Sequence, residues 1–211
     1  MRESGYNNQS LLNIDPQPLL VVLSGPSGAG KDAVLARLKQ LDLRLEYIVT
    51  VTTRPRRRNE QDNVHYCFVS AERFQQMQAA GDLLEYAQVY GNWYGVPRQP
   101  VKKALAEGKD TMLKVDIQGA ATIKKALPQA VFIFLTPRSK ADLDGRLRRR
   151  NSETAADLEL RLKNVEQEMA QLPMFDYIVV NEHGQLDKVI DQIEAIITAE
   201  KLRVKPREYR L

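Results

Sequence analysis

The feature that most constrains the fold is a glycine-rich stretch, SGPSGAGKDAV at residues 24–34, which follows the apolar run LLVVLS at residues 19–24. A short, uninterrupted apolar run of this kind is typical of a strand buried on both faces of a parallel sheet. The stretch has the spacing G-x-x-x-x-G-K, in which backbone N–H groups and a helix N-terminus surround phosphate groups. The strand, the turn and a following helix therefore predict a phosphate-binding loop.

This loop predicts a nucleoside triphosphate, accompanied by Mg²⁺, as the bound ligand. Lys31 is placed to reach the terminal phosphates. The pattern ordinarily ends in serine or threonine, whose hydroxyl contacts Mg²⁺, but Asp32 stands in that position. The residues predicted to surround the triphosphate are Ser24, Gly25, Pro26, Ser27, Gly28, Ala29, Gly30, Lys31 and Asp32.

Strand-like and helix-like segments alternate along the chain, which predicts a parallel sheet covered by helices on both faces. The predicted strands are residues 19–24, 47–52, 65–70, 83–90, 93–96, 111–116, 130–135 and 177–181, and the predicted helices begin near Gly30, Ala71, Pro97 and Leu186. Two further helical stretches are expected between residues 139 and 172. The region 50–98 breaks the alternation, so we expect an insertion that carries its own binding site.

Composition limits the remaining possibilities. With 211 residues, 43% of them hydrophobic, and a mild net charge of +4, the chain suits one α/β domain with a substantial core. Cys67 is the single cysteine, which excludes a disulfide framework and a cysteine-based zinc site within the chain. It is expected to be a small buried hydrophobe. His65 and His183 have no ligand spacing around them, so no metal site built by the protein alone is predicted.

The expected location is cytoplasmic. No segment approaches the roughly 20 apolar residues that span a membrane, and the polar N-terminus is not typical of a secretory signal. We expect a flexible N-terminal extension over residues 1–17.

A second group of polar residues lies in the expected insertion. Arg54 and Arg57 are three apart on a loop and suit a bidentate grip on a phosphate. Tyr66 and Tyr94 offer hydroxyl donors. Glu85 interrupts the apolar run LLEYAQV, either as a solvated edge residue or as a planar acceptor pair for a base, and its spacing alone favours the solvated edge.

Seven segments, in order, resemble guanylate kinases: SGPSGAGK, TTRPRR, HYCFVS, EYAQVYGNWYG, VDIQGA, RLRRR and IVVN. The resemblance covers about residues 19 to 200. It implies transfer of the γ-phosphoryl group of ATP to GMP with Mg²⁺, on a P-loop NTPase fold of three α/β/α layers around a central parallel sheet. It also implies an inserted GMP-binding region with mixed or antiparallel strands, and a helical lid. The implied single domain spans 18–211, with the core at 18–49, 99–137 and 166–202, the insert at about 50–98 and the lid at about 138–165.

The resemblance also implies roles for individual residues. Arg54, Arg57, Tyr66 and Tyr94 match positions that hold the GMP phosphate, Glu85 and Asp116 match carboxylates that accept hydrogen bonds from guanine, and Thr50 matches a residue near the base. Arg146, Arg150 and Arg161 match arginines that close on the transferring phosphates, and Asn181 matches an asparagine near the adenine of ATP. The implied catalytic residues are Lys31, Arg54, Arg146, Arg150 and Arg161.

Three positions depart from the family pattern. Asp32 replaces a hydroxyl residue, Lys114 replaces an acid two residues before Asp116, and Val96 replaces a serine near the guanine. The end of the 111–116 strand is expected beside the phosphate loop, so we expect Asp32 and Lys114 to approach each other without nucleotide. With nucleotide, Asp32 would be an oxygen ligand of Mg²⁺, directly or through water. The alternative is that Asp32 only favours the helix start, which is worth about 0.3–1 kcal/mol.

The sequence leaves other functions open. Ribose 1,5-bisphosphate phosphokinase has a similar fold and can share the features at Asp32 and Val96, whereas Glu85 and Asp116 favour a guanine substrate. An inactive guanylate-kinase-like binding domain would be expected to lose phosphate-gripping residues such as Lys31. The basic runs RPRRR and RLRRR could be nucleic-acid patches, but no aromatic-studded RNA platform is present. We therefore expect ATP and GMP as partners, no nucleic acid or membrane, and a monomer or homodimer.

Overall fold

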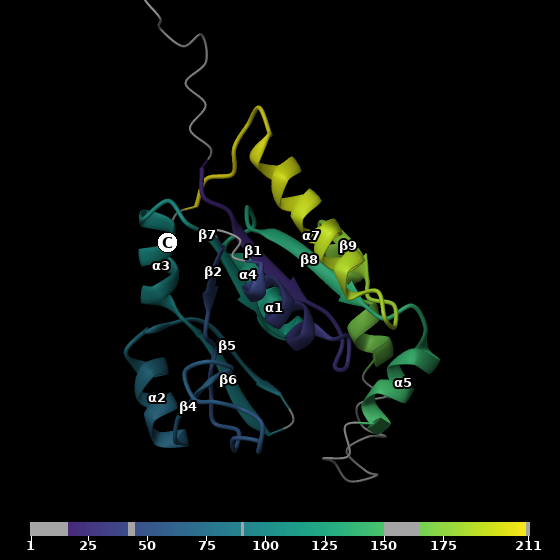
Figure 1. Cartoon of the computed structure of the whole chain (residues 1–211). Helices are drawn as coiled ribbons and strands as arrows, with labels where there is room; N and C mark the ends of the chain where they lie inside the picture. Colours follow the sequence, from purple (N-terminus) through teal and green to yellow (C-terminus); the bar gives the residue numbers. More distant parts are fainter. Residues whose placement is uncertain (1–16, 42–44, 90, 150–164, 210–211) are drawn as a thin grey trace, which may run out of the picture.

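The computed structural model describes residues 17–41, 45–89, 91–149 and 165–209. Their elements form two sheets (Figure 1). The larger sheet has five strands in the order β2-β7-β1-β8-β9, and every neighbouring pair is parallel. Its strands are β1 (Leu20–Ser24), β2 (Leu45–Ile48), β7 (Asp110–Lys114), β8 (Val131–Thr136) and β9 (Tyr177–Val180).

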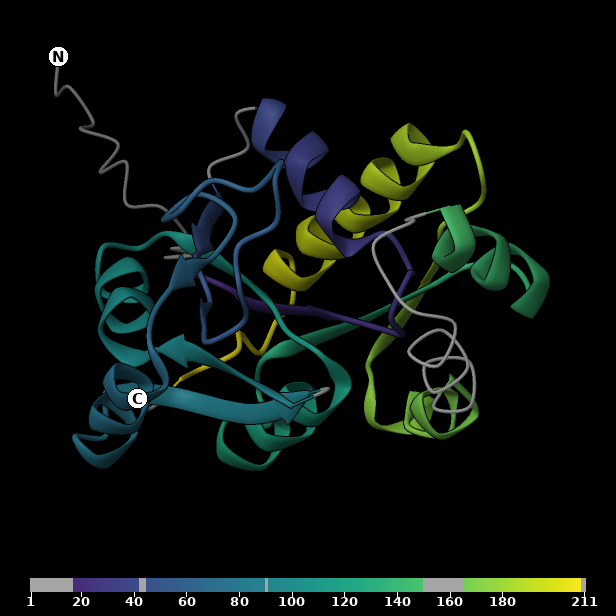
Figure 2. The ribbon, with the colours of Figure 1, turned by 90° about the horizontal axis from the view of Figure 1, so that it is seen from below.

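Helices cover both faces of the larger sheet. One face packs against α1 (Lys31–Gln40) and α7 (Leu186–Lys201), which lie side by side in Figure 2. The other face packs against α3 (Arg98–Ala106) and α4 (Ile117–Ala126). The side chains of β1 alternate between the two cores, with Val21 facing the first and Val22 the second. The predicted three-layer α/β/α fold with a central parallel sheet is confirmed.

The smaller sheet comes from the segment between α1 and α3. Its order is β4-β3-β6-β5, with one parallel pair, β3 with β4, and two antiparallel pairs. The strands are β3 (Val51–Thr52), β4 (Cys67–Phe68), β5 (Leu83–Val89) and β6 (Asn92–Pro97). Helix α2 (Ala71–Ala79) buries Phe74 against them. Ser70 caps this helix by accepting a hydrogen bond from the backbone of Arg73.

Two predictions about elements were wrong. The run YIVTVT was predicted to be one strand, but it divides between β2 in the larger sheet and β3 in the smaller sheet. Thr50 lies at the crossing, where its Oγ1 donates to the carbonyl of Lys114 at 3.3 Å and fixes the change of sheet. Helix α4 was not predicted at all, although Asp116 caps it by accepting from the backbone of Gly119.

The remaining described elements complete the molecule. Helix α5 spans Lys140–Arg149, residues 165–169 are helical, and a short 3₁₀ helix spans Leu172–Met174. Cys67, predicted to be a small buried hydrophobe, is only half-buried and packs at the margin of the core of the smaller sheet. Within the described part of the chain, every helix lacks either the length or the apolar character that crossing a bilayer requires.

Candidate active site

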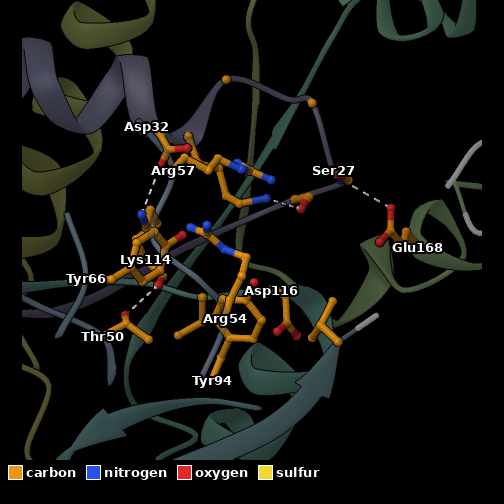
Figure 3. Close-up of a pocket in the computed structure, with 16 residues that line it drawn as sticks. Ser27, Asp32, Thr50, Arg54, Arg57, Tyr66, Tyr94, Lys114, Asp116 and Glu168 are labelled. Carbon is orange, nitrogen blue, oxygen red and sulfur yellow. Dashed lines mark hydrogen bonds and ion pairs between the residues drawn. The ribbon is translucent and has the colours of Figure 1, made fainter. Parts of the chain in front are cut away.

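A cavity of about 150 Å³ lies where the carboxyl ends of β1 and β7 face the smaller sheet (Figure 3). The glycine-rich loop contributes Gly25, Ser27, Gly28, Gly30, Lys31 and Asp32 to its lining. The opposite side is lined by Thr50, Arg54, Arg57, Tyr66, Tyr94 and Asp116, all predicted to bind the second substrate. The structure therefore brings together the two groups of residues that the sequence separates.

The glycine-rich loop depends on two glycines in its tight turns. Gly25 has φ of 145°, and a Cβ there would lie 2.0 Å from the carbonyl oxygen of Leu135. Gly30 has φ of 98°, and a Cβ there would lie 2.3 Å from the side-chain nitrogen of Asn181. Both positions thus need the left-handed conformation and the missing side chain that only glycine offers.

Lys31 lies folded into the loop that it follows. Its Nζ donates to the carbonyls of Gly25 at 2.5 Å and Pro26 at 3.1 Å. Burial lowers the pKa of Lys31, although the neighbouring Asp32 and Glu168 carboxylates oppose that effect. An ammonium group held here by neutral carbonyls is available to an anion that enters the loop.

Asp32 and Lys114 meet, as the sequence predicts. The Nζ of Lys114 lies 2.7 Å from Oδ1 of Asp32, a contact that joins α1 to the end of β7 (Figure 3). The Lys114 side chain is 9% exposed, whereas that of Asp32 is 56% exposed. Burial favours the neutral amine of Lys114, but Tyr66 and Asp32 outweigh burial and raise its pKa.

The basic and aromatic residues of the smaller sheet form a compact cluster. A single nitrogen of the Arg54 guanidinium, Nη2, donates to both carboxylate oxygens of Glu60, at 2.7 and 3.0 Å. Its guanidinium lies over the ring of Tyr66, 5.4 Å from the centroid, and the rings of Tyr66 and Tyr94 pack edge to face at 6.0 Å. Arg57 also lines the cavity. Arg54, Arg57, Tyr66 and Tyr94 therefore line the same cavity as the glycine-rich loop (Figure 3).

Glu85 is buried, which excludes the solvated-edge interpretation. It is 4% exposed, and its Oε2 has no hydrogen-bond partner. The carboxyl group packs against α4 so closely that a Cβ on Gly119 would lie 2.8 Å from Oε2. Burial, with a smaller contribution from Asp116, raises the pKa of Glu85 to about 8. Glu85 does not line the cavity itself, whereas Asp116 does.

Arg146 and Asn181 lie on the other side of the glycine-rich loop. The guanidinium of Arg146 donates to the carbonyls of Ala29 and Asn181, and the Asn181 amide donates to the carbonyl of Ala29 at 2.8 Å. Together with Gly28 and Gly30 they line a separate recess. Arg146 therefore supports the loop from behind and does not face the cavity. Two predicted residues, Arg150 and Arg161, lie outside the described part of the chain.

Comparison with known proteins identifies the family. A model of the family described as guanylate kinase matches residues 17–200. A guanylate kinase of Carboxydothermus hydrogenoformans is 40% identical over 92% of this chain and 94% of its own length. Guanylate kinase 2, chloroplastic/mitochondrial, of Oryza sativa subsp. japonica is 44% identical over 91% of this chain and 68% of its own length. The crystal structure of guanylate kinase from Anaplasma phagocytophilum superposes with a TM-score of 0.73, at 30% identity, over 90% of each chain. This chain belongs to the guanylate kinase family.

In this member of the guanylate kinase family, two acidic residues at the site were missed by the sequence analysis. Glu60 holds Arg54, and Glu168 accepts a hydrogen bond from the backbone of Ser27 at 3.4 Å (Figure 3). Glu60 lies six residues after Arg54 in the irregular loop, so the acidic pair NEQD next to the arginines was the available signal. Glu168 comes from a helix remote in sequence, and no local pattern relates it to the loop.

Val96, the third departure from the guanylate kinase pattern, points into the core. It is 1% exposed and packs with Leu84, Val101 and Leu113 in the core behind α3 and α4. It pairs with Glu85 across the β5–β6 ladder. The position that carries a serine in the family pattern thus contributes apolar packing here and offers no hydroxyl to a ligand.

The residues present fit a magnesium ion held mainly by phosphates. Among the described residues, no group of three or more His, Cys, Asp or Glu side chains could hold a metal ion. Mg²⁺ in nucleotide sites commonly uses one or two carboxylates together with substrate phosphates and water. Asp32, a half-exposed carboxylate at the cavity wall, suits that mode of binding.

Proposed function

We propose that this chain transfers the γ-phosphoryl group of ATP to GMP, giving ADP and GDP. The observation that carries the proposal is the single cavity in which the glycine-rich loop faces Arg54, Arg57, Tyr66 and Tyr94. A triphosphate bound by the loop and a monophosphate bound by the opposite cluster would place donor and acceptor in line. Such positioning, with neutralisation of charge, accounts for most of the catalysis in phosphoryl transfer.

The acceptor base is proposed to be guanine because two carboxyl groups lie beside the cavity. Guanine presents N1–H and N2–H₂ donors, which would favour the ionised form of Glu85 and satisfy its unpartnered Oε2. Asp116 would accept a second hydrogen bond. Adenine lacks these donors at the corresponding edge and would leave the buried acceptor unsatisfied, at a cost of about 1–3 kcal/mol.

In the proposed reaction, an oxygen of the GMP phosphate attacks the γ-phosphorus as the bond to the leaving ADP oxygen breaks. Lys31 leaves its carbonyl partners for the phosphates, and Arg54 and Arg57 orient the acceptor phosphate. Mg²⁺, held by Asp32 and the phosphates, would supply further charge neutralisation. On closure, Arg146 would have to leave the carbonyls of Ala29 and Asn181 and, with Arg150 and Arg161, close on the phosphates. Asn181 would contact the adenine of ATP.

The division of the chain into regions stays a prediction from the sequence. We propose that 50–98 is the GMP-binding insert and 138–165 is the lid, which excludes water on closing. A cytoplasmic location, a monomeric or dimeric state and a flexible segment 1–17 are predictions of the same kind.

A coupled assay of ADP release tests the proposed function. The purified chain is given ATP and Mg²⁺ with GMP, AMP or ribose 1,5-bisphosphate as the acceptor. We expect turnover with GMP that exceeds turnover with AMP by at least about tenfold, the equivalent of one unsatisfied buried acceptor. Preference for ribose 1,5-bisphosphate would contradict the guanine assignment, and tight nucleotide binding without any turnover would indicate an inactive binding domain.

A further inference from the structure

Lys114 occupies the middle of the cavity wall, between the two groups of phosphate-binding residues. It ends β7, and its Nζ lies 4.1 Å from the centroid of the Tyr66 ring and 2.7 Å from Asp32 (Figure 3). Asp32 belongs to the glycine-rich loop side, and Tyr66 belongs to the opposite cluster. Lys114 therefore directly contacts a residue of each side.

The contacts of Lys114 restrict the position of its ammonium group but leave it able to bind an entering anion. The Tyr66 ring face restricts its position through a cation–π interaction. Asp32, its charged partner, is more than half exposed, so water competes for the carboxylate and the bond is easily exchanged. A buried, oriented ammonium with an exchangeable partner is suited to bind an anion that enters the cavity.

We propose that Lys114 is a catalytic residue that binds the phosphoryl group during its transfer between the two nucleotides. The proposal rests on the proposed function. The ammonium group donates to a non-bridging oxygen of the transferred group and offsets the negative charge there, while the bond to ADP breaks and the bond to GMP forms. No proton leaves Lys114. Asp32 holds the ammonium group before the nucleotides bind and is released from it when they do.

The alternative is that Lys114 acts only through Asp32, by neutralising the carboxylate and holding it in place. In that case Lys114 would be a positioning residue, and removing its partner would reproduce the effect of removing Lys114. The two roles differ in which ligand complex needs the ammonium group, so binding measurements separate them.

The test compares Lys114→Met with Asp32→Ser, and uses Lys125→Met, a change of an exposed lysine on α4, as the control. Calorimetry measures the Kd of three ligands: GMP, a non-hydrolysable ATP analogue, and a bisubstrate analogue in which adenosine and guanosine are joined by five phosphates. Only the bisubstrate analogue places phosphoryl oxygens midway between the two sites. Steady-state kinetics with ATP and GMP gives kcat and KM for the same variants.

We expect Lys114→Met to weaken binding of the bisubstrate analogue by about 10- to 100-fold, which is the range for a charge-assisted hydrogen bond. Binding of GMP alone, or of the ATP analogue alone, should weaken by less than about threefold. The kcat should fall with little change in KM. Asp32→Ser should keep most of the bisubstrate affinity, because serine is a residue of the usual loop pattern and its hydroxyl still offers Mg²⁺ an oxygen ligand. Equal weakening of all three ligands, no weakening, or an equal loss in Asp32→Ser would overturn the proposal. A wild-type chain that does not phosphorylate GMP would instead refute the proposed function.

Thermal unfolding shows whether Lys114→Met folds. If Lys114→Met does not fold because Asp32 has lost this partner, the double variant Asp32→Asn with Lys114→Met removes both charges, and the single variant Asp32→Asn becomes its reference. Compared with Asp32→Asn, the double variant should show the same selective loss of affinity for the bisubstrate analogue.

Discussion

Glu85 places a carboxyl group where its charged form is disfavoured. It is 4% exposed, its Oε2 has no hydrogen-bond partner, and burial next to Asp116 raises its pKa to about 8 from an ordinary value of 4.5. Between these two values the folded chain binds more protons than the unfolded chain. The contribution of Glu85 to stability is therefore complete below its ordinary pKa of 4.5 and is lost as the pH rises through its pKa of about 8 in the folded chain.

Replacing Glu85 with glutamine removes this titration. We expect the free energy of unfolding of the wild type to fall by a few kcal/mol between about pH 5 and about pH 8, at about 1.36 kcal/mol per unit of pKa difference. Glu85→Gln should flatten this dependence. Urea unfolding across that range measures the effect, with Glu208→Gln, a change of an exposed carboxylate, as the control. Parallel pH profiles for wild type and Glu85→Gln would contradict the assignment.

At the scale of secondary-structure elements, the close packing of α4 against β5 positions part of the proposed site. Gly119 of α4 faces the Glu85 carboxyl group, with hypothetical Cβ distances of 2.8 Å to Oε2 and 3.1 Å to Cδ. Alanine ordinarily stabilises a helix interior by about 1 kcal/mol over glycine. Here an added methyl group would have to displace Glu85, which lies on the guanine side of the proposed site.

Gly119→Ala is therefore expected to weaken GMP binding by about tenfold, because displacing packed groups costs about 1–3 kcal/mol. Binding of a non-hydrolysable ATP analogue should stay unchanged. Calorimetry with both ligands gives the comparison, and Thr122→Ala, at an exposed position of the same helix, is the matched control. An unchanged Kd for GMP would mean that Glu85 does not contact the base.

The sequence predicts the parallel sheet and the glycine-rich loop because these depend on local signals. Buried strands such as β1 and β8 are continuous apolar runs, and the loop glycines are required by backbone geometry. The division of YIVTVT between two sheets depends on a tertiary hydrogen bond from Thr50, which no local pattern contains. Helix α4 was missed because its cap, Asp116, had been interpreted only as a ligand of the base.

Part of the site was predictable because a departure from a family pattern implies a compensating change. Asp32 and Lys114 are individually unexpected, and their pairing follows from the adjacency of a parallel strand end and the loop. Glu168 could not be predicted, because its contact with Ser27 depends on how a helix remote in sequence approaches the loop. The burial of Glu85 was also hidden, since it depends on the absence of a side chain at Gly119.

At the scale of the whole molecule, the segment after α7 bonds to three parts of the chain: the end of α7, the residues before β8 and the start of β1. Arg207 makes a bidentate contact with Glu200 at 2.7 and 2.8 Å, and also donates to the carbonyls of Gln129 and Ala130 ahead of β8. The Glu200 side chain is 1% exposed and the Arg207 side chain is 11% exposed. Tyr209 packs against the second core, and its hydroxyl accepts from the backbone of Leu20 at 3.1 Å.

Arg207→Ala should lower the free energy of unfolding by about 3 kcal/mol, because it removes the buried, hydrogen-bonded cation of the Glu200 carboxylate. Arg203→Ala is the matched control, since Arg203 contacts the same carboxylate at 3.6 Å from a side chain that is 50% exposed. Arg203→Ala should lower the free energy of unfolding by less than about 1 kcal/mol. Urea unfolding measures the free energy of unfolding of both variants. An equal decrease in the two would show that the burial of an ion pair does not determine its contribution to stability.

The bond between Tyr209 and Leu20 also sets an order of events during synthesis. Leu20 opens the strand that leads into the glycine-rich loop, and it leaves the ribosome long before Tyr209 is translated. A nascent chain lacking this segment exposes the first backbone amide of β1 and part of the core beside it. The first backbone amide of β1 therefore gains its hydrogen-bond partner only after Tyr209 has emerged, well after all five strands of the central sheet have been synthesised.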